Sequence, residues 1–319
     1  MKTLSIITPA YNEALNLPVF YQRVSEALRD NGVHWEWIIV DDHSRDETPN
    51  VIGRLSESDP RVRGYRLSRN FGAHKAVRCG LDMARGDGIV IMASDLQDPP
   101  EAIPRLLNEW QKGAQVVWAA RQSRVGETHT TVWLSRIFHF IIKKASGISE
   151  MPAQGADFYL IDHMVREGLK QFSESSVNIG ALTMWLGYRQ TTILFEQQER
   201  LNGKSGWTLR KKLTLAIDTF VSFSHVPIRV VSCIGFATSA LGLAWASFIL
   251  WNALHGTAVP GWASIMIVVL VLGGVTLLAL GVLGEYLWRT LQESRKRPNY
   301  VIESRWEEAG VAATLALHS

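Results

Sequence analysis

The 319-residue sequence contains only two cysteines, Cys79 and Cys233, and neither lies near a histidine or another cysteine at metal-ligand spacing. A disulfide framework and a cysteine-based metal site are therefore not expected, and a reducing compartment is favoured. The start of the chain also lacks the apolar core of a signal peptide, because the apolar run after Lys2 ends at Thr8. We expect the amino-terminal part to stay in the cytoplasm.

Charge is absent from two long stretches near the carboxyl end, 230–254 and 259–284, although the whole chain is 20% charged. Each stretch is long enough to cross a hydrocarbon core of about 30 Å as a helix. The sequence therefore predicts two transmembrane helices, at about 230–254 and 260–285, within a membrane segment 229–289. Core helices of a large soluble domain are the alternative, which stretches of this length disfavour.

The residues that flank these stretches predict their orientation. The connecting loop, 251–262, has neither lysine nor arginine, whereas both outer flanks are basic. The basic flanking residues are Arg210, Lys211, Lys212, Arg229, Arg289, Arg295, Lys296 and Arg297. Because lysine and arginine gather on the cytoplasmic side of membrane proteins, both chain ends are expected in the cytoplasm.

The rest of the chain alternates short apolar runs with helical spacing. Apolar runs at 4–8, 35–40, 88–92 and 115–119 predict strands, and residues 17–28 are spaced as in a helix. Strands that alternate with helices predict an α/β domain with a parallel sheet. Ligands bind such sheets at the carboxyl ends of the strands, so the site is expected there.

Glycine-rich phosphate-binding turns are missing from this domain. The turn after the first predicted strand, residues 8–13, reads TPAYNE, which is not a nicotinamide-binding fingerprint, and no P-loop sequence occurs. A dehydrogenase is therefore disfavoured. The third apolar run is followed instead by Asp95, Gln97 and Asp98, whose oxygen atoms could hold a divalent cation beside a diphosphate.

An ordered set of motifs spread over about residues 3–300 can be compared with known families. The motifs are PAYNE at 9–13, VDDHS at 40–44, LSRNFG at 67–72, DLQDPP at 95–100, ARQSR at 120–124, GADF at 155–158, WLGYRQ at 185–190 and GVLGEY at 281–286. This set resembles glycosyltransferase family 2, most closely the bacterial polyprenyl-phosphate glycosyltransferases of the bactoprenol glucosyltransferase type, which are related to dolichol-phosphate mannose synthase. The resemblance implies an α/β fold, with a GT-A (Rossmann-like) catalytic domain and a C-terminal two-helix transmembrane hairpin.

The resemblance also assigns a nucleotide-binding site. The residues that it places around the nucleoside are Pro9, Tyr11, Glu13 and Asp42. Tyr11 could instead serve packing alone, and Glu13 could instead cap the helix that follows it. We expect the four residues to form the nucleotide-binding site.

Metal binding and catalysis are implied at two further motifs. Asp95 and Gln97 would hold Mg²⁺ or Mn²⁺ on the donor diphosphate, where a Lewis acid neutralises the leaving group without a protein proton donor. Asp157 matches the family's acidic residue beside the acceptor, so Asp157 and Asp95 are the expected catalytic residues. A lipid monophosphate has its second pKa near about 6, so little deprotonation is needed at neutral pH. We therefore expect Asp157 to orient the acceptor or a sugar hydroxyl rather than to act as a base.

Basic residues at other motifs resemble the family's phosphate-binding positions. These residues are Arg121, Arg124, Arg200 and Lys204. Arginine suits this task because its planar fork can bind two phosphate oxygens, although each residue could instead be a solvated surface charge. Residues 207–228 are expected to form an interfacial amphipathic helix, and 132–145 either a second one or a core-facing helix.

The predicted domain order is a catalytic domain at 1–206, the interfacial helix, the membrane segment and a cytoplasmic tail at 290–319. The predicted location is a bacterial inner membrane. The resemblance implies inverting transfer of a sugar, from a UDP-sugar by preference, to undecaprenyl phosphate. It also implies a homo-oligomer, expected as a tetramer, and no nucleic-acid partner. Ala93 stands where the family usually has an acid, and Gly206 where it has lysine. A processive polysaccharide synthase and a non-catalytic membrane scaffold stay open as alternatives.

Overall fold

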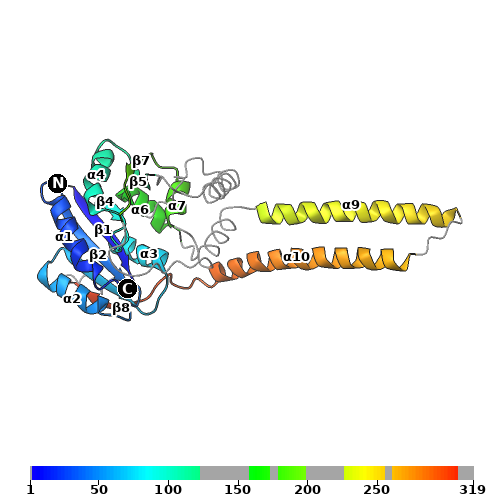
Figure 1. The fold of residues 1–319 in the computed structure, drawn as a ribbon, viewed down its shortest axis with the longest axis horizontal. Helices are drawn as coiled ribbons and strands as arrows, with labels where there is room; N and C mark the ends of the chain where they lie inside the picture. The colour runs from blue at the N-terminus through cyan, green and yellow to red at the C-terminus, as the bar shows by residue number, and fades with distance from the viewer. Residues whose placement is uncertain (1, 123–157, 173–178, 199–225, 256–260, 308–319) are drawn as a thin grey trace. The chain divides into compact units, whose positions relative to one another are not determined.

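In the computed structural model the chain forms two units. It describes residues 2–122, 158–172, 179–198, 226–255 and 261–307. One unit comprises Met1–Thr219 together with Pro298–Ser319, and the other comprises Phe220–Arg297. The first unit contains an α/β sheet and the second a pair of long helices (Figure 1).

The sheet has the strand order β7-β5-β6-β4-β1-β2-β3-β8 in the part of the chain that the structure describes. The strands are β1 Thr3–Ala10, β2 His34–Asp41, β3 Val62–Leu67, β4 Gly88–Ile91, β5 Val116–Arg121, β6 Tyr159–Asp162, β7 Gln190–Phe195 and β8 Ile302–Trp306. β1 pairs in parallel with β2 and β4, and β2 with β3, whereas β6 and β8 run antiparallel to their neighbours. The prediction of a parallel sheet is therefore wrong for these two strands, because apolar runs carry no information on strand direction.

The four predicted strands and the predicted helix are present as β1, β2, β4, β5 and α1. The strand β3 was not predicted, because Arg63 and Arg66 interrupt its apolar pattern. Both are largely buried, and each pairs with a carboxylate, Arg63 with Glu36 at 2.8 Å and Arg66 with Asp41 at 2.6 Å. Burial of a charge requires such a partner, and the partner is not visible in a local pattern.

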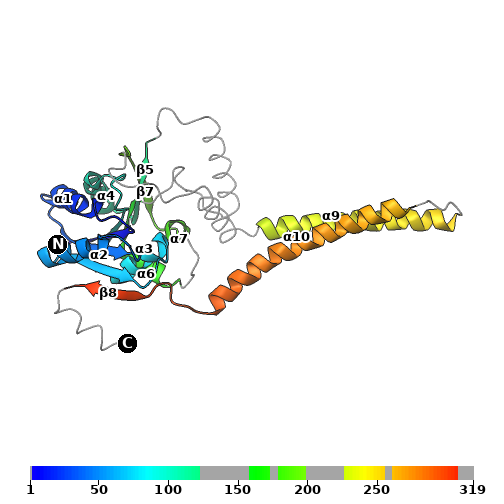
Figure 2. The same cartoon turned by 60° about the horizontal axis from the view of Figure 1, so that its bottom comes forward.

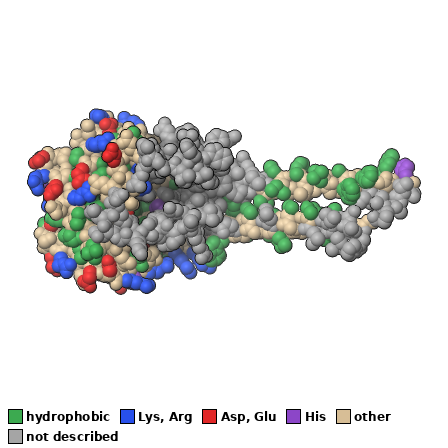
Figure 3. Space-filling model, in the orientation of Figure 1, with side chains coloured by type: hydrophobic (Ala, Val, Ile, Leu, Met, Phe, Trp, Pro, Cys, Tyr) green, Lys and Arg blue, Asp and Glu red, His purple; other side chains and the backbone are tan. Residues whose placement is uncertain are grey.

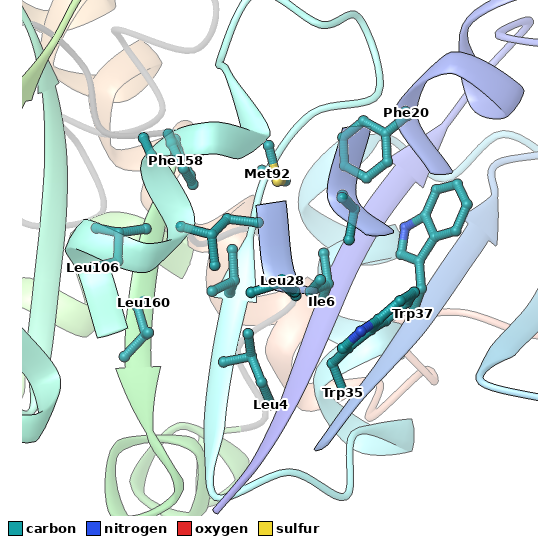
Figure 4. Packing of buried hydrophobic residues seen from close by; sticks show 14 of the residues in the cluster. Leu4, Ile6, Phe20, Leu28, Trp35, Trp37, Met92, Leu106, Phe158 and Leu160 are labelled. Atoms are coloured by element: carbon teal, nitrogen blue, oxygen red, sulfur yellow. The ribbon is translucent and has the colours of Figure 1, made fainter. Parts of the chain in front are cut away.

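Helices cover both faces of the sheet. The helices of this unit are α1 Asn16–Leu28, α2 Thr48–Ser58, α3 Ala73–Met83, α4 Ile103–Gln111, α6 His163–Lys170 and α7 Ile179–Trp185, with the 3₁₀ helix η1 Pro100–Ala102. One apolar cluster joins α1, α2 and α4 to the sheet, with Phe20 stacked on Trp37 (Figure 4). A second cluster joins α3, α6 and α7 to the other face. The two clusters hold the strands in place from both faces of the sheet. The loops that follow the strands therefore extend from a rigid base.

The end of the described chain returns to this sheet. β8 lies at its edge (Figure 2) and pairs with β3, although it falls within the expected cytoplasmic tail, 290–319. The ring of Trp306 lies against Gly64 of β3 and Gly53 of α2. A Cβ atom at Gly64 would be 2.3 Å from Ile52 Cγ2 and 2.8 Å from Trp306 Cε3. The absence of a side chain at Gly64 is thus what lets the tail pack closely on the sheet.

The second unit contains α9 Val226–Leu254 and α10 Trp262–Ser294, which contact each other. Their residue ranges overlap 230–254 and 260–285, and their role as transmembrane helices stays a prediction. By length and composition, Val271–Trp288 of α10 is the segment of the described chain that is long and apolar enough to cross a membrane. Large apolar side chains such as Phe236, Leu241 and Leu277 are exposed along both helices (Figure 3). An exposed apolar surface of this kind is typical of a helix that contacts lipid or another protein.

The close packing at Gly64 gives a prediction on stability. Gly64→Ala should cost about 1–3 kcal/mol, because its methyl group overpacks the contact with Ile52 and Trp306. That cost corresponds to a fall of roughly 2–10 °C in Tm, measured on the full chain in detergent. Gly53→Ala is the matched control, since its Cβ would meet the same indole ring at 3.3 Å and alanine favours the helix. An equal loss in both variants would contradict the overpacking at Gly64.

Candidate active site at the carboxyl edge of the sheet

The loops that follow β4, β1 and β2 meet at one edge because these three strands are parallel neighbours. Each loop contains a non-glycine residue with a positive φ, namely Leu96 at 61°, Asn12 at 58° and His43 at 62°. The left-handed region is costly for such residues, above all for leucine, and persists only where the surrounding contacts enforce it. Strained loops of this kind gather at ligand sites, so the edge is the candidate functional site.

Asp41, the last residue of β2, holds the turn that follows this strand. Its fully buried carboxylate accepts hydrogen bonds from the Ser44 backbone N–H through Oδ1, at 2.9 Å, and from Arg66 Nη1 through Oδ2, at 2.6 Å. The Ser44 hydroxyl in turn accepts a hydrogen bond from the Asn12 backbone N–H at 2.9 Å. The turn after β2 is thereby held on one side by β3 and on the other by the loop after β1.

Asp42, an expected nucleotide-binding residue, connects this turn to the start of α3. Its Oδ1 accepts from the Phe71 backbone N–H at 2.6 Å and its Oδ2 from the Gly72 N–H at 2.9 Å. The residue is 4% exposed, and this burial raises the pKa of the Asp42 carboxyl while the two backbone hydrogen bonds oppose the rise. Asp42 therefore fixes residues 71–72, at the start of α3, against the turn after β2.

The other expected nucleotide-binding residues lie at the end of β1. Pro9 pairs with Val40 in the sheet, and Tyr11 is 43% exposed, so its ring is available to a ligand rather than packed in the core. The Glu13 carboxylate accepts a hydrogen bond from the Asn16 side chain at 2.5 Å. The Glu13 carbonyl also accepts a hydrogen bond from the Leu17 backbone N–H at 3.1 Å, so Glu13 contacts the start of α1 and the alternative of a capping role stays a prediction.

The acidic loop after β4 carries the expected metal-binding residues. Asp95 is 8% exposed, and its Oδ1 accepts a hydrogen bond from the Gln97 backbone N–H at 3.2 Å. Ser94 donates to the Pro9 carbonyl at 3.3 Å, and the Gln97 carbonyl accepts from the Gln198 N–H at 2.9 Å. The loop is thus fastened to β1 and to the chain that follows β7.

Arg121, an expected phosphate-binding residue, ends β5 opposite Phe195 of β7. β4 and β5 both run antiparallel to β6, so β5 points the same way as β4 and Arg121 lies at the same carboxyl edge of the sheet. Asp157, Arg124, Arg200 and Lys204 lie outside the described residues, as do 132–145 and most of the expected interfacial helix 207–228. The structure therefore brings seven of the expected residues to one edge of the sheet, and their roles stay predictions: Pro9, Tyr11, Glu13, Asp42, Asp95, Gln97 and Arg121.

Three residues at this edge were not foreseen from the sequence: Asn12, Ser44 and Arg66. Asn12 Oδ1 accepts from the Arg45 backbone N–H at 2.9 Å, which adds a second tie between the loops after β1 and β2. Asn12 and Ser44 stand inside the quoted motifs, PAYNE and VDDHS, where their short polar side chains were a usable signal for loop bonding. Arg66 gave no such signal, because its partners are distant in the sequence.

Comparison with known proteins gives the family. The sequence profile of Glycosyl transferase family 2 matches residues 5–172. The chain is 38% identical over 304 residues to an uncharacterized glycosyltransferase of Synechocystis, covering 95% of each chain. It is 33% identical over 301 residues to the prophage bactoprenol glucosyl transferase homolog of Escherichia coli, covering 94% of this chain and 98% of the relative. The bactoprenol glucosyl transferase of Shigella phage SfX is also 33% identical, over 95% of this chain and 99% of the relative.

Solved structures support the fold class. The mannosyl-3-phosphoglycerate synthase of Rubrobacter xylanophilus superposes with a TM-score of 0.50 at 18% identity, over 68% of this chain and 71% of that one. The glucosyl-3-phosphoglycerate synthase of Mycobacterium tuberculosis gives the same TM-score and identity, over 68% of this chain and 76% of that one. The fold is thus a mixed α/β sheet with GT-A-like neighbours. With the family profile and the near full-length relatives, this establishes that the chain belongs to glycosyl transferase family 2 and is a glycosyltransferase.

Proposed function

We propose that the protein transfers a sugar, with inversion, from a nucleoside diphosphate donor, by preference a UDP-sugar, to a polyprenyl phosphate in the membrane. The observation that carries the proposal is the likeness to bactoprenol glucosyl transferases, which extends over 94–95% of this chain and so includes α9 and α10 as well as the sheet. The acceptor named in those relatives is a lipid carrier. The product would be a lipid-linked sugar for modification of cell-envelope glycans.

The donor site of this proposal lies at the loops after β1 and β2. Tyr11 is exposed at the edge of the sheet. Pro9 and Glu13 lie at the end of β1 and in the loop after it, and Asp42 lies directly after β2. The hydrogen bonds of Asp41 and Asp42 hold these loops in place before any ligand arrives. A preorganised pocket loses less conformational freedom on binding, which favours affinity for the nucleoside.

A divalent cation, Mg²⁺ or Mn²⁺, fits the acidic loop. Asp95, Gln97 and Asp98 provide oxygen ligands, which hard cations prefer. No group of three or more acidic, histidine or cysteine side chains suited to a metal occurs among the residues that the structure describes. The donor diphosphate would therefore complete the coordination, as is usual for Mg²⁺ held by one or two carboxylates and substrate phosphates. When bound, the cation would stabilise charge on the departing nucleoside diphosphate.

In the proposed reaction, an oxygen of the lipid phosphate attacks the anomeric carbon of the donor sugar. The bond from that carbon to the diphosphate breaks, and the nucleoside diphosphate departs with the electron pair, which inverts the configuration. Arg121, Arg124, Arg200 and Lys204 are assigned to the phosphate groups by the family resemblance, and Asp157 to orientation of the acceptor. Because the acceptor oxygen is already ionised near neutral pH, no strong base is required.

The helix pair would anchor the enzyme in the bacterial inner membrane. β3 precedes α9 and β8 follows α10, yet the two strands pair in one sheet, so both ends of the helix pair start from the same side of any membrane. With Val271–Trp288 as one crossing, this return of the chain supports an even number of crossings and hence a second span in α9. The basic flanks favour the cytoplasm as the side that holds the sheet.

The proposed reaction is tested directly with purified protein. Full-length chain in detergent, with Mn²⁺ or Mg²⁺, undecaprenyl phosphate and radiolabelled nucleotide sugars, should give a labelled lipid that carries one sugar. Omission of the lipid phosphate is the control and should abolish the product. A long polymer would instead support the processive synthase, and absence of turnover with every donor would support the non-catalytic scaffold.

The metal-binding role of Asp95 is tested by substitution. Asp95→Asn should lower kcat roughly 100-fold or more and raise the Mn²⁺ concentration needed for half-maximal rate, because a charged ligand is lost. Glu101→Gln is the matched control, since this neighbouring carboxylate pairs with Arg23 at 2.6 Å and is half exposed. Near-normal metal dependence in Asp95→Asn would contradict the assignment.

The role of Asp157 is tested by its pH dependence. Asp157→Asn should lower the rate without a new titrating limb near neutrality, because the lipid phosphate is already ionised. The measurement is kcat between about pH 6 and pH 9 for both proteins. Recovery of the activity of Asp157→Asn at high pH would instead assign Asp157 as the general base.

A further inference from the structure

The strand β8 is irregular at one residue. Its register with β3 pairs Arg66 with Ser304 and then Leu67 with Ile302, so Glu303 is the extra residue of a bulge. A bulge bends its strand and redirects a side chain, and bulges are frequent beside active sites. Glu303 is thereby turned toward the carboxyl ends of β2 and β3.

Glu303 contacts two residues at the edge of the candidate site. Its Oε2 accepts a hydrogen bond from Arg66 Nε at 2.9 Å and lies 3.5 Å from His43 Nδ1. His43 stands between Asp41–Asp42 and Ser44, in the left-handed conformation noted above. A side chain from beyond α10 therefore reaches the turn that follows β2.

Arg66 connects Glu303 to the turn after β2 through hydrogen bonds of its guanidinium group. While Nε donates to Glu303, Nη1 donates to Asp41 Oδ2 at 2.6 Å and Nη2 donates to the Ser44 carbonyl at 3.2 Å. The guanidinium group is rigid and planar, so an acceptor on Nε fixes the directions of the two Nη groups. The position of Glu303 thus orients the guanidinium group of Arg66 toward Asp41 and Ser44, the first and last residues of the 41–44 turn.

We propose that Glu303 is a positioning residue of the donor nucleotide site, which acts through Arg66 to hold the turn that carries Asp42. The proposal rests on the function proposed above, because it places the nucleoside at this turn. It means that the chain beyond the helix pair completes the nucleotide site. Asp42 in turn fixes the Phe71 and Gly72 N–H groups, so the effect of Glu303 extends to the start of α3.

The docking of β8 itself does not depend on Glu303. Trp306 packs against Gly64 and Gly53, the Tyr300 hydroxyl donates to Asp82 at 2.8 Å, and the backbone of β8 pairs with β3. The Glu303 side chain is 48% exposed, so its loss leaves no buried cavity. Substitution at Glu303 can therefore change the site without unfolding the domain.

The test compares Glu303→Gln with the unmodified full-length chain in detergent. We expect UDP to bind about 3–10-fold more weakly by calorimetry, as for loss of a partly exposed charged hydrogen bond. The KM for the nucleotide sugar should rise by a similar factor, while kcat and the KM for the lipid phosphate stay within about twofold. Arg305→Gln is the matched control, an exposed neighbour on the same strand, and should change neither value.

Two further measurements separate positioning from a merely structural role. In an Arg66→Lys background, Glu303→Gln should add less than about twofold, because Glu303 acts through the guanidinium group. In the ligand-free protein, Glu303→Gln should speed hydrogen exchange at the Ser44, Phe71 and Gly72 amides without a change in Tm beyond about 2 °C. Absence of UDP binding by the unmodified chain would overturn the donor-site assignment. Unchanged exchange together with unchanged UDP affinity in Glu303→Gln would overturn the role of Glu303 alone.

Discussion

Two adjacent buried carboxylates, Asp41 and Asp42, hold the candidate site together. A buried carboxylate is costly unless its oxygens receive hydrogen bonds, and here each of the four oxygens has a donor from a different residue. Asp41 joins the turn to β3, and Asp42 joins it to the start of α3. The requirement to satisfy two buried charges thus fixes three segments that are separate in the sequence.

The sheet explains why those segments meet. The parallel pairing of β4, β1 and β2 places their following loops side by side, and two apolar clusters hold the strands rigidly beneath them. On this rigid base the loops maintain Asn12, His43 and Leu96 in a conformation that each would avoid in isolation. The acidic loop at 95–98 and the loops after β1 and β2 are therefore held side by side at one edge of the sheet.

After α10 the chain returns to the sheet and adds the strand β8 beside β3. β8 is held by the close approach of Trp306 to Gly64, and its bulge directs Glu303 to Arg66 and His43. The chain thus leaves the sheet, forms the helix pair α9 and α10, and returns to the same sheet as β8.

The sequence by itself determined the features that depend on local pattern: the strands β1, β2, β4 and β5, the helices α1, α9 and α10, and the motif loops at the strand ends. Their apolar runs, helical spacing and uncharged length are properties of neighbouring residues. Only the tertiary structure decided that β6 and β8 run antiparallel, that β3 buries two arginines, and that Asp42 binds the amides of residues 71–72. It also decided that Arg66 contacts Glu303, 237 positions away. Such contacts arise from the packing of distant segments and produce no periodic pattern in the sequence.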